Sequence, residues 1–212
     1  MSIVKLTNIS KSFNEIPLFT NINLSIEKGR TYGIRGYNGS GKSVLLKLIC
    51  GFIKPDSGDV YIDKQYKDKK DDFPEKFGII IDRPGYIANK TGFENLKTLA
   101  SIRDTITDHD IYKAMEIVGL NPHIKQKMKN YSLGMKQKIA IAQTFMENQE
   151  VLILDEPFNA LDFDSIQNMR QLLLKFKKEG KTIIITSHNQ EDLDILCDEQ
   201  FQINNSTLQK IE

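Results

Sequence analysis

The chain has 212 residues, of which 40% are hydrophobic and 27% charged, a composition that fits one globular domain with a buried core. Its 29 basic and 28 acidic side chains give a formal charge of +1, so no general attraction to nucleic acid or to an anionic membrane surface is expected. Cys50 and Cys197 lack metal-type spacing, and no apolar run approaches the roughly 18 residues that span a bilayer. We therefore expect a cytoplasmic protein that reaches any membrane through a partner.

The first part of the chain alternates between apolar and polar side chains, most clearly at Ile22, Leu24 and Ile26, which predicts a half-exposed strand in an antiparallel layer. A short strand is expected at 31–34, followed by a glycine-rich turn and a buried helix at 43–50. Further short runs are aliphatic throughout, as expected of parallel strands covered on both faces. These runs are 79–81, 151–154 and 183–185.

Residues 92–148 have the pattern of helices, and Thr107 and Asp110 are spaced as a capping box at the start of one of them. The stretch 67–72 mixes both charge signs and is predicted to be a solvated loop. A polar turn at 204–206 predicts a terminal hairpin. The alternation of strands and helices indicates an α/β fold.

The strongest chemical pattern is the P-loop sequence Gly36-Tyr-Asn-Gly-Ser-Gly41-Lys42-Ser43, which lies between a predicted strand and a predicted helix. Its backbone N–H groups and the helix N-terminus are suited to hold phosphate oxygens. Lys42 is predicted to reach the β- and γ-phosphates, and Ser43 to ligate Mg²⁺. The flanking elements disfavour an incidental glycine-rich turn. The predicted nucleotide-binding residues here are Gly36, Tyr37, Asn38, Gly39, Ser40, Gly41, Lys42, Ser43 and Val44.

Two adjacent carboxylates, Asp155 and Glu156, end the apolar run 151–154. Side chains alternate along a strand, so the two carboxylates are expected to have different tasks. Asp155 is predicted to hold Mg²⁺ through water, and Glu156 to orient and polarise the water that attacks the γ-phosphate. A strand that simply ends at solvent is the alternative, and the P-loop disfavours it.

These motifs and two others carry a resemblance to ABC ATPases. Tyr131-Ser-Leu-Gly-Met-Lys-Gln137 resembles the signature motif, and Asp155-Glu-Pro157 followed by Asn159-Ala-Leu-Asp162 resembles the Walker B motif and D-loop. His188 stands where the family has its switch histidine, and Phe13 where an aromatic ring stacks on adenine, although a core aromatic remains the alternative for Phe13.

The resemblance spans nearly the whole chain. It implies an α/β P-loop NTPase fold with a RecA-like core, an antiparallel β subdomain and a helical subdomain that carries the signature. A single ABC ATPase domain is expected over 1–212, with the core at about 1–82 and 150–212 and the helical subdomain at about 83–149.

The signature precedes a predicted helix. The Ser132 hydroxyl, the Gly134 backbone N–H and the positive N-terminal end of that helix are therefore expected to form a second anion site. In the family this site closes on the γ-phosphate held by a partner subunit, and hydrolysis lets the pair open. The residues expected to contact that ATP are Ser132, Leu133, Gly134 and Met135. His188 is expected to sense the γ-phosphate, and Asp162 to communicate across the dimer.

Three departures from the family pattern stand out. The usual Leu-Ser-Gly-Gly-Gln is changed at Tyr131, Leu133 and Met135, and the form Ser-Leu-Gly-Met resembles that of bacterial peptide-antibiotic resistance exporters of the bacitracin and lantibiotic type. Val44 replaces the usual threonine. Asp82 stands where the family has a glutamine that touches Mg²⁺ and the attacking water, so we expect Asp82 at the metal and in catalysis.

The resemblance implies an ATP-binding and ATP-hydrolysing subunit that uses ATP and Mg²⁺ to power transport, with export of peptide antibiotics or similar amphipathic compounds favoured. The expected partners are integral membrane permease subunits and a second ABC subunit, identical or not, with no nucleic acid. The location is then peripheral, on the inner face of the cell membrane. The family's permease contact begins near 83–86, where Pro84 and Gly85 suit a hinge or an ordinary turn.

Other classes stay open at this point. A nucleotide-regulated ABC-type module with little turnover, or with a role outside transport, is compatible with Asp82 and Met135, although Glu156 argues against it. An ABC-type ATPase that acts on DNA or ribosomes would need an insertion or a basic linker that the sequence lacks. A P-loop phosphotransferase would leave the signature and the segment 159–162 without an explanation.

Overall fold

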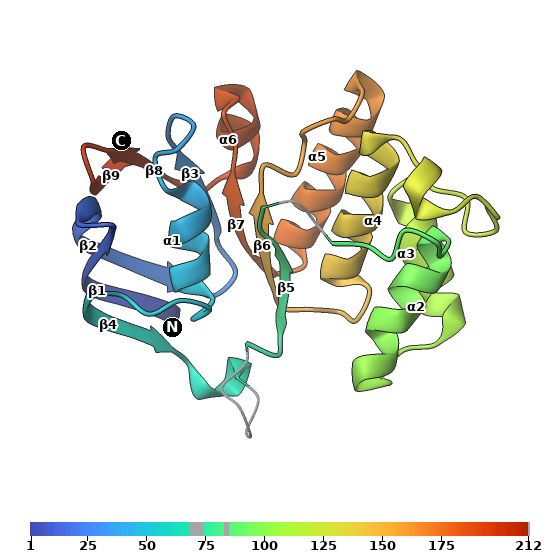
Figure 1. Ribbon diagram of the computed structural model, residues 1–212, viewed down its shortest axis with the longest axis horizontal. Helices are drawn as coiled ribbons and strands as arrows, with labels where there is room; N and C mark the ends of the chain where they lie inside the picture. Colours follow the sequence, from blue (N-terminus) through green and yellow to red (C-terminus); the bar gives the residue numbers. More distant parts are fainter. Residues whose placement is uncertain (68–73, 83–84, 212) are drawn as a thin grey trace.

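The computed structural model describes residues 1–67, 74–82 and 85–211 (Figure 1). The predicted solvated loop at 67–72 therefore lies outside the described residues except for its first residue, as does the predicted hinge residue Pro84. Within the described ranges, no helix is long and apolar enough to cross a bilayer.

The N-terminal part of the chain forms the predicted antiparallel layer. Its strands are β1 (Ser2–Phe13), β2 (Ile16–Glu27) and β4 (Ser57–Ile62), in the order β2-β1-β4. On β2 the buried side chains of Ile22, Leu24 and Ile26 alternate with exposed ones. The half-exposed strand predicted from this alternation is confirmed.

A second, mostly parallel sheet forms the centre of the molecule, in the order β5-β6-β7-β3-β8-β9. All neighbouring pairs are parallel except β8 and β9, which form the terminal hairpin predicted from the turn. Asn205 and Ser206 in that turn have φ of 46° and 60°, as a two-residue hairpin turn requires. The strands are β3 (Thr31–Arg35), β5 (Phe77–Ile80), β6 (Val151–Asp155), β7 (Thr182–Thr186), β8 (Glu199–Asn204) and β9 (Thr207–Ile211).

The aliphatic runs are explained by two hydrophobic cores, one on each face of this sheet. On β6, Val151 and Ile153 belong to the core shared with the antiparallel layer and α1 (Lys42–Ile49), which touches both sheets. Leu152 and Leu154 belong to the other core, with α5 (Phe163–Lys178) and α6 (Gln190–Leu196). A strand buried on both faces has no polar face, so it does not alternate.

The helices of 92–145 lie together at one side of the central sheet (Figure 1). They are α2 (Gly92–Arg103), α3 (Asp108–Ile117) and α4 (Leu133–Phe145), with a short 3₁₀ turn at η2 (Met128–Asn130). A second 3₁₀ turn, η1 (Lys64–Tyr66), lies outside this group, between β4 and β5. The Asp110 carboxylate accepts from the Thr107 N–H at 2.9 Å, as the capping box predicts. The grouping of α2, α3 and α4 agrees with the predicted subdomain boundaries near 82 and 150, which stay a prediction.

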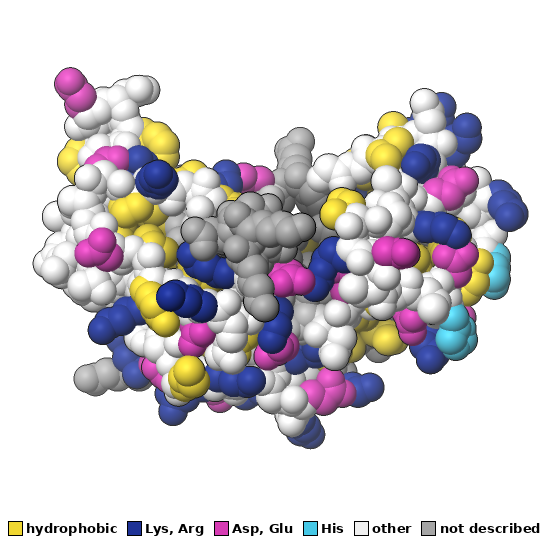
Figure 2. Space-filling view, turned by 90° about the horizontal axis from the view of Figure 1, so that it is seen from below, with side chains coloured by type: hydrophobic (Ala, Val, Ile, Leu, Met, Phe, Trp, Pro, Cys, Tyr) yellow, Lys and Arg dark blue, Asp and Glu magenta, His cyan; other side chains and the backbone are white. Residues whose placement is uncertain are grey.

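Figure 2 shows one face of the molecule, on which basic and acidic side chains are interspersed. Neither sign gathers into one large patch on this face, in keeping with the formal charge of +1. Any charged ligand must therefore be attracted locally rather than by the field of the whole protein.

Candidate nucleotide site

The candidate site lies at the carboxyl ends of β3, β6 and β7, which are neighbours in the central sheet. In α/β sheets, ligands bind at this edge because the loops that leave the parallel strands meet there. A cleft of about 890 Å³ opens over it. The predicted residues that line the cleft are Phe13, Tyr37, Asn38, Gly39, Gly41, Lys42, Ser43, Val44, Asp82, Leu133, Asp155 and Glu156.

The P-loop joins β3 to α1 with two residues in the left-handed region, Gly39 at φ 84° and Gly41 at φ 99°. A Cβ added to Gly41 would lie 2.7 Å from the ring of Phe19. The loop therefore needs glycine at Gly41 for space as well as for its backbone conformation.

Lys42 is nearly buried at the start of α1, with 8% of its surface exposed. Its Nζ donates to the Gly36 carbonyl at 2.8 Å and lies 3.4 Å from Glu156 Oε1. Ser40 Oγ is also buried, and no other described residue partners it. A buried cation and an orphaned hydroxyl inside a glycine loop fit the phosphate groups that the sequence predicts there.

Side-chain oxygen atoms from α1, β6 and β7 lie close together at Asp155. Ser43 Oγ donates to Asp155 Oδ2 at 2.5 Å and Thr186 Oγ1 donates to Asp155 Oδ1 at 2.6 Å. The Ser43 hydroxyl and the Asp155 carboxylate are hard ligands of the kind that Mg²⁺ prefers. Among the described residues no group of three or more His, Cys, Asp and Glu side chains has the arrangement of a metal site.

Asp82 lies next to this group but shows different partners from those expected of a metal ligand. Its backbone N–H donates to Asp155 Oδ2 at 3.3 Å, while its carboxylate Oδ2 lies 2.6 Å from Lys47 Nζ on α1. The residue has φ of 59°. A lysine partner for Asp82 was not anticipated from the sequence, because the contact joins residues on different elements.

Glu156 and His188, which are far apart in the sequence, meet beside Lys42. Glu156 Oε2 accepts from the His188 N–H at 3.2 Å and lies 2.9 Å from His188 Nδ1. The Glu156 N–H donates to Thr186 Oγ1 at 2.9 Å. The two adjacent carboxylates therefore have different partners, as the alternation of the strand suggests.

The signature residues form the start of α4. Ser132 is the N-cap and accepts from the Met135 N–H at 3.1 Å. Leu133 is 72% exposed, whereas Met135 packs against the core that contains α4. This packing gives Met135 a structural role at a position where the family has glutamine.

Gly134 has a neighbour that sequence reasoning missed. A Cβ at this position would lie 2.7 Å from the carbonyl oxygen of Ala160, in the loop after β6. Gln137, one turn further along α4, donates to the Pro157 carbonyl at 3.0 Å. The signature helix is therefore in direct contact with the loop that follows Glu156 in the same chain.

Two further predicted residues have clear local settings. Asp162 is the N-cap of α5, and the Ser165 backbone N–H, 2.8 Å from Asp162 Oδ1, holds the pKa of the Asp162 carboxyl below its usual range. Phe13 is half exposed at the edge of the cleft, so the alternative of a core aromatic is wrong.

Sequence reasoning also missed Thr186, whose hydroxyl donates to the Asp155 carboxylate and accepts from the Glu156 backbone N–H, although its place directly after an apolar run was a usable signal. It expected Tyr86 only in the segment that meets the permease and not at the nucleotide cleft, and it did not single out Lys136. The Lys136 ammonium lies 5.0 Å from the centre of the Tyr86 ring, within the range of a cation–π contact.

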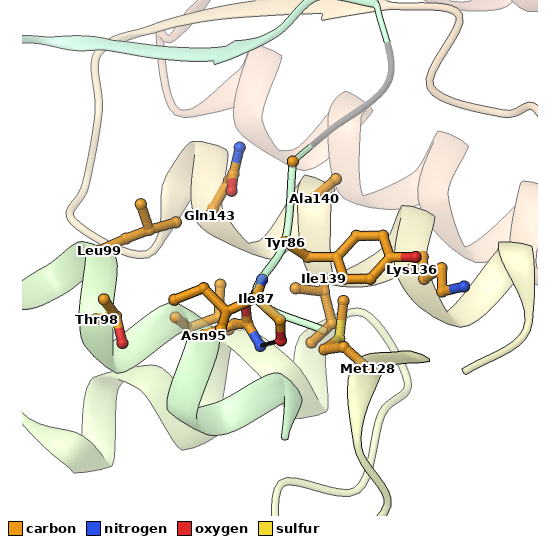
Figure 3. A pocket seen from close by; sticks show the side chains of 12 residues that line it. Tyr86, Ile87, Asn95, Thr98, Leu99, Met128, Lys136, Ile139, Ala140 and Gln143 are labelled. Atoms are coloured by element: carbon orange, nitrogen blue, oxygen red, sulfur yellow. Dashed lines mark hydrogen bonds between the residues drawn. The ribbon is translucent and has the colours of Figure 1, made fainter. Parts of the chain in front are cut away.

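A second hollow, of about 310 Å³, lies between the segment 85–87, α2 and α4 (Figure 3). Its lining is largely apolar, with Ile87, Leu96 and Leu99 among its side chains. Tyr86 and Lys136 line this groove and the nucleotide cleft alike, so their contact separates the two.

The fold and the site define a P-loop ATPase with an antiparallel layer and a helical region that carries the signature-like sequence 131–137. The structure is similar to a dimeric bacterial ABC transporter cassette, with a TM-score of 0.86 and 25% identity over 99% of each chain. It is equally similar to a dimeric cassette in a post-hydrolysis state bound to ADP and phosphate.

Comparisons of the sequence agree. The family model for ABC transporters matches residues 19–159. The chain is 38% identical to YybJ, an ABC transporter ATP-binding protein of Bacillus subtilis, over 99% of this chain and 96% of that protein. It is 37% identical to the bacitracin transport ATP-binding protein BcrA of Enterococcus faecalis over 92% of this chain, although it spans only 64% of that protein. It is 34% identical to the lantibiotic transport ATP-binding protein SrtF of Streptococcus pyogenes, over 92% and 84% of the two chains.

The chain belongs to the ABC transporter family, as an ATP-binding subunit with the ATPase activity of that class. The resemblance inferred from the motifs and the predicted fold class are both confirmed.

Proposed function

We propose that this ATPase powers the export of peptide antibiotics or similar amphipathic compounds, and that two such subunits close around ATP to do so. The support for the cargo is the likeness to bacitracin and lantibiotic transport proteins at 34–37% identity, together with the Ser-Leu-Gly-Met form of the signature. The observation that carries the chemistry is the Glu156 carboxylate, held between Lys42 and His188.

Each residue at the sheet edge has a task in this proposal. The P-loop N–H groups and Lys42 bind the phosphates. Ser43 and Asp155 hold Mg²⁺, which when bound draws negative charge from the phosphates. Glu156 accepts a proton from the attacking water and orients it. Phe13 stacks on the base from the edge of the cleft.

Asp82 takes part through a change of partner. Its carboxylate is paired with Lys47 at 2.6 Å, and both side chains are partly exposed to solvent, so the pair is weak and exchangeable. We propose that Asp82 leaves Lys47 and turns toward the metal when the nucleotide is bound, which gives this subunit an acidic residue where the family has glutamine.

The start of α4 supports the proposed closure of two subunits. The Ser132 hydroxyl accepts from the Met135 N–H, so its own hydrogen is free to donate to an anion. The adjacent N-terminal turn adds a positive partial charge. We propose that this site binds the γ-phosphate held by the P-loop of a second subunit, with His188 sensing that phosphate and Asp162 beside the interface.

The apolar groove between 85–87, α2 and α4 suits the permease partner. A short apolar segment of a membrane subunit would bury Leu99 and Ile87, which are 40% and 45% exposed. Because Tyr86 and Lys136 also line the nucleotide cleft, a partner in the groove acts next to the site of hydrolysis. We propose on this basis that the subunit is peripheral, on the inner face of the membrane.

The test compares the parent chain with Glu156→Gln, which keeps the shape of the side chain and removes its charge. Mg²⁺-dependent ATP turnover should fall about 10²–10⁴-fold, the usual contribution of a general base. ATP binding should persist, and gel filtration should show an ATP-bound dimer that accumulates in the variant. Turnover that stays at the parent level would refute the role of Glu156, and a variant that stays monomeric with ATP would refute closure in pairs.

The cargo needs a cellular measurement. Cells that carry Glu156→Gln in place of the parent gene should become more sensitive to bacitracin or to lantibiotics, while their sensitivity to a small hydrophilic antibiotic stays the same. Equal sensitivity of the two strains to all peptide antibiotics would contradict the proposed cargo and leave the ATPase assignment intact.

A further inference from the structure

A buried ion pair lies behind the site, away from the cleft. Arg170 on α5 is 4% exposed and Asp192 on α6 is 2% exposed. The Arg170 Nε and Nη2 groups donate to Asp192 Oδ1 at 2.9 and 2.6 Å. Apolar residues of similar volume are often as stabilising as a buried ion pair, so stability by itself does not explain why these charges lie here.

The second oxygen of Asp192 extends the contact to the turn that carries His188. Ser187 Oγ donates to Asp192 Oδ2 at 2.9 Å and accepts from the Asn189 N–H at 3.1 Å. Ser187 is itself 3% exposed. Its hydroxyl therefore ties the backbone on the far side of His188 to the buried pair.

His188 needs such support, because its own side chain is 68% exposed and gains little orientation from packing. Its N–H and Nδ1 both reach Glu156 Oε2, and this requires the backbone of the turn to hold one conformation. Thr186 supports the other end of the turn, through its bonds to Asp155 and to the Glu156 N–H.

The network also closes a ring through the chain. The loop after Glu156 leads to Asp162, the N-cap of α5, and α5 carries Arg170. From Arg170 the contacts run through Asp192 and Ser187 to His188, and so back to Glu156. One connected set of bonds thus holds both the carboxylate and the histidine that contacts it.

We propose that Arg170, Asp192 and Ser187 are positioning residues for ATP hydrolysis, which hold the turn 187–189 so that His188 orients the Glu156 carboxylate. The inference rests on the proposed role of Glu156. None of the three residues lines the cleft, so their effect reaches the chemistry through His188.

The first variant is Ser187→Ala, which removes the hydroxyl and leaves the Arg170–Asp192 pair in place. We expect kcat for ATP to fall about 10-fold, because small displacements of a catalytic group have effects of this size, while KM changes less than about twofold. Ser187→Thr keeps the hydroxyl and should recover most of the rate. Glu191→Gln is the matched control: Glu191 is 66% exposed and contacts Arg170 without touching Ser187, so kcat should not change.

The second variant separates positioning from stability. Replacing the pair together, by Arg170→Met with Asp192→Leu, removes both buried charges at similar side-chain size, so the free energy of unfolding in urea should fall only by the cost of the Ser187 hydroxyl left without its acceptor. The double variant should nevertheless show the low kcat of Ser187→Ala. A double variant that is as stable as the parent and equally active would overturn the inference.

A spectroscopic readout tests the same point without turnover. The chain has three histidines, so the ring signals of His188 can be assigned in NMR spectra with His188→Gln. Introducing Glu156→Gln into the parent chain should shift the His188 ring signals. Introducing the same substitution into the Ser187→Ala variant should shift them much less. Equal shifts in the two backgrounds would overturn the inference, whereas a Glu156→Gln variant with full turnover would overturn the proposed function itself.

Discussion

The contact between Gly134 and Ala160 leads to a prediction that needs no nucleotide. A methyl group at Gly134 would place Cβ 2.7 Å from the Ala160 carbonyl oxygen, whereas the closest favourable C···O contacts begin at about 3.3 Å. Gly134→Ala must therefore move α4 and the loop after Glu156 apart by roughly 0.6 Å. The Gln137 bond to the Pro157 carbonyl opposes that movement.

The expected cost is that of overpacking, about 1–3 kcal/mol of unfolding free energy. For a chain of this size, 2 kcal/mol corresponds to a melting temperature lower by roughly 4–8 °C. Thermal unfolding of the nucleotide-free protein, followed by circular dichroism, measures it. Gly85→Ala is the matched control, because a Cβ at Gly85 meets nothing within 4 Å.

The result distinguishes two reasons for glycine at this position. If Gly134 serves only to bring a bare N–H to a phosphate, the substitution leaves the melting temperature of the nucleotide-free protein unchanged. An unchanged value, equal to that of Gly85→Ala, would refute the reasoning from the Ala160 contact.

Two other predictions concern pH and the groove. Backbone N–H groups hold the pKa values of Glu94, Asp110 and Asp162 below their usual range. These ionised carboxylates therefore stabilise the folded state at pH values above the ordinary carboxyl pKa of about 4, and this contribution is lost as pH falls through their lower pKa values in the folded protein. Urea unfolding should become easier between about pH 5 and pH 3, and a protein that gains stability there would contradict this. Leu99→Glu, in the groove, should weaken co-sedimentation with membrane vesicles that carry the permease at least about 10-fold, since a charge buried in an apolar contact is costly. Ile117→Glu, on the exposed side of α3, is its control, and equal binding of the two variants would argue against docking in the groove.

The sequence by itself indicated several of the elements and the P-loop. The aliphatic runs of β6 and β7 had no polar face, which is a local property of strands covered on both sides. The P-loop glycines and Lys42 lie within one short segment, 36–43, so their chemistry could be inferred from their spacing. The hairpin turn at Asn205 and the capping box at Thr107 depend on neighbouring residues in the same way.

Only the tertiary structure decided which residues meet from different elements. The Lys47 partner of Asp82, the Ala160 carbonyl next to Gly134, and the bonds from Arg170 through Asp192 to Ser187 all join segments that the sequence separates. A periodic pattern shows that a side chain is buried, but not what it is buried against. The partners depend on strand order and helix packing, and these emerge only when the two cores form around the central sheet.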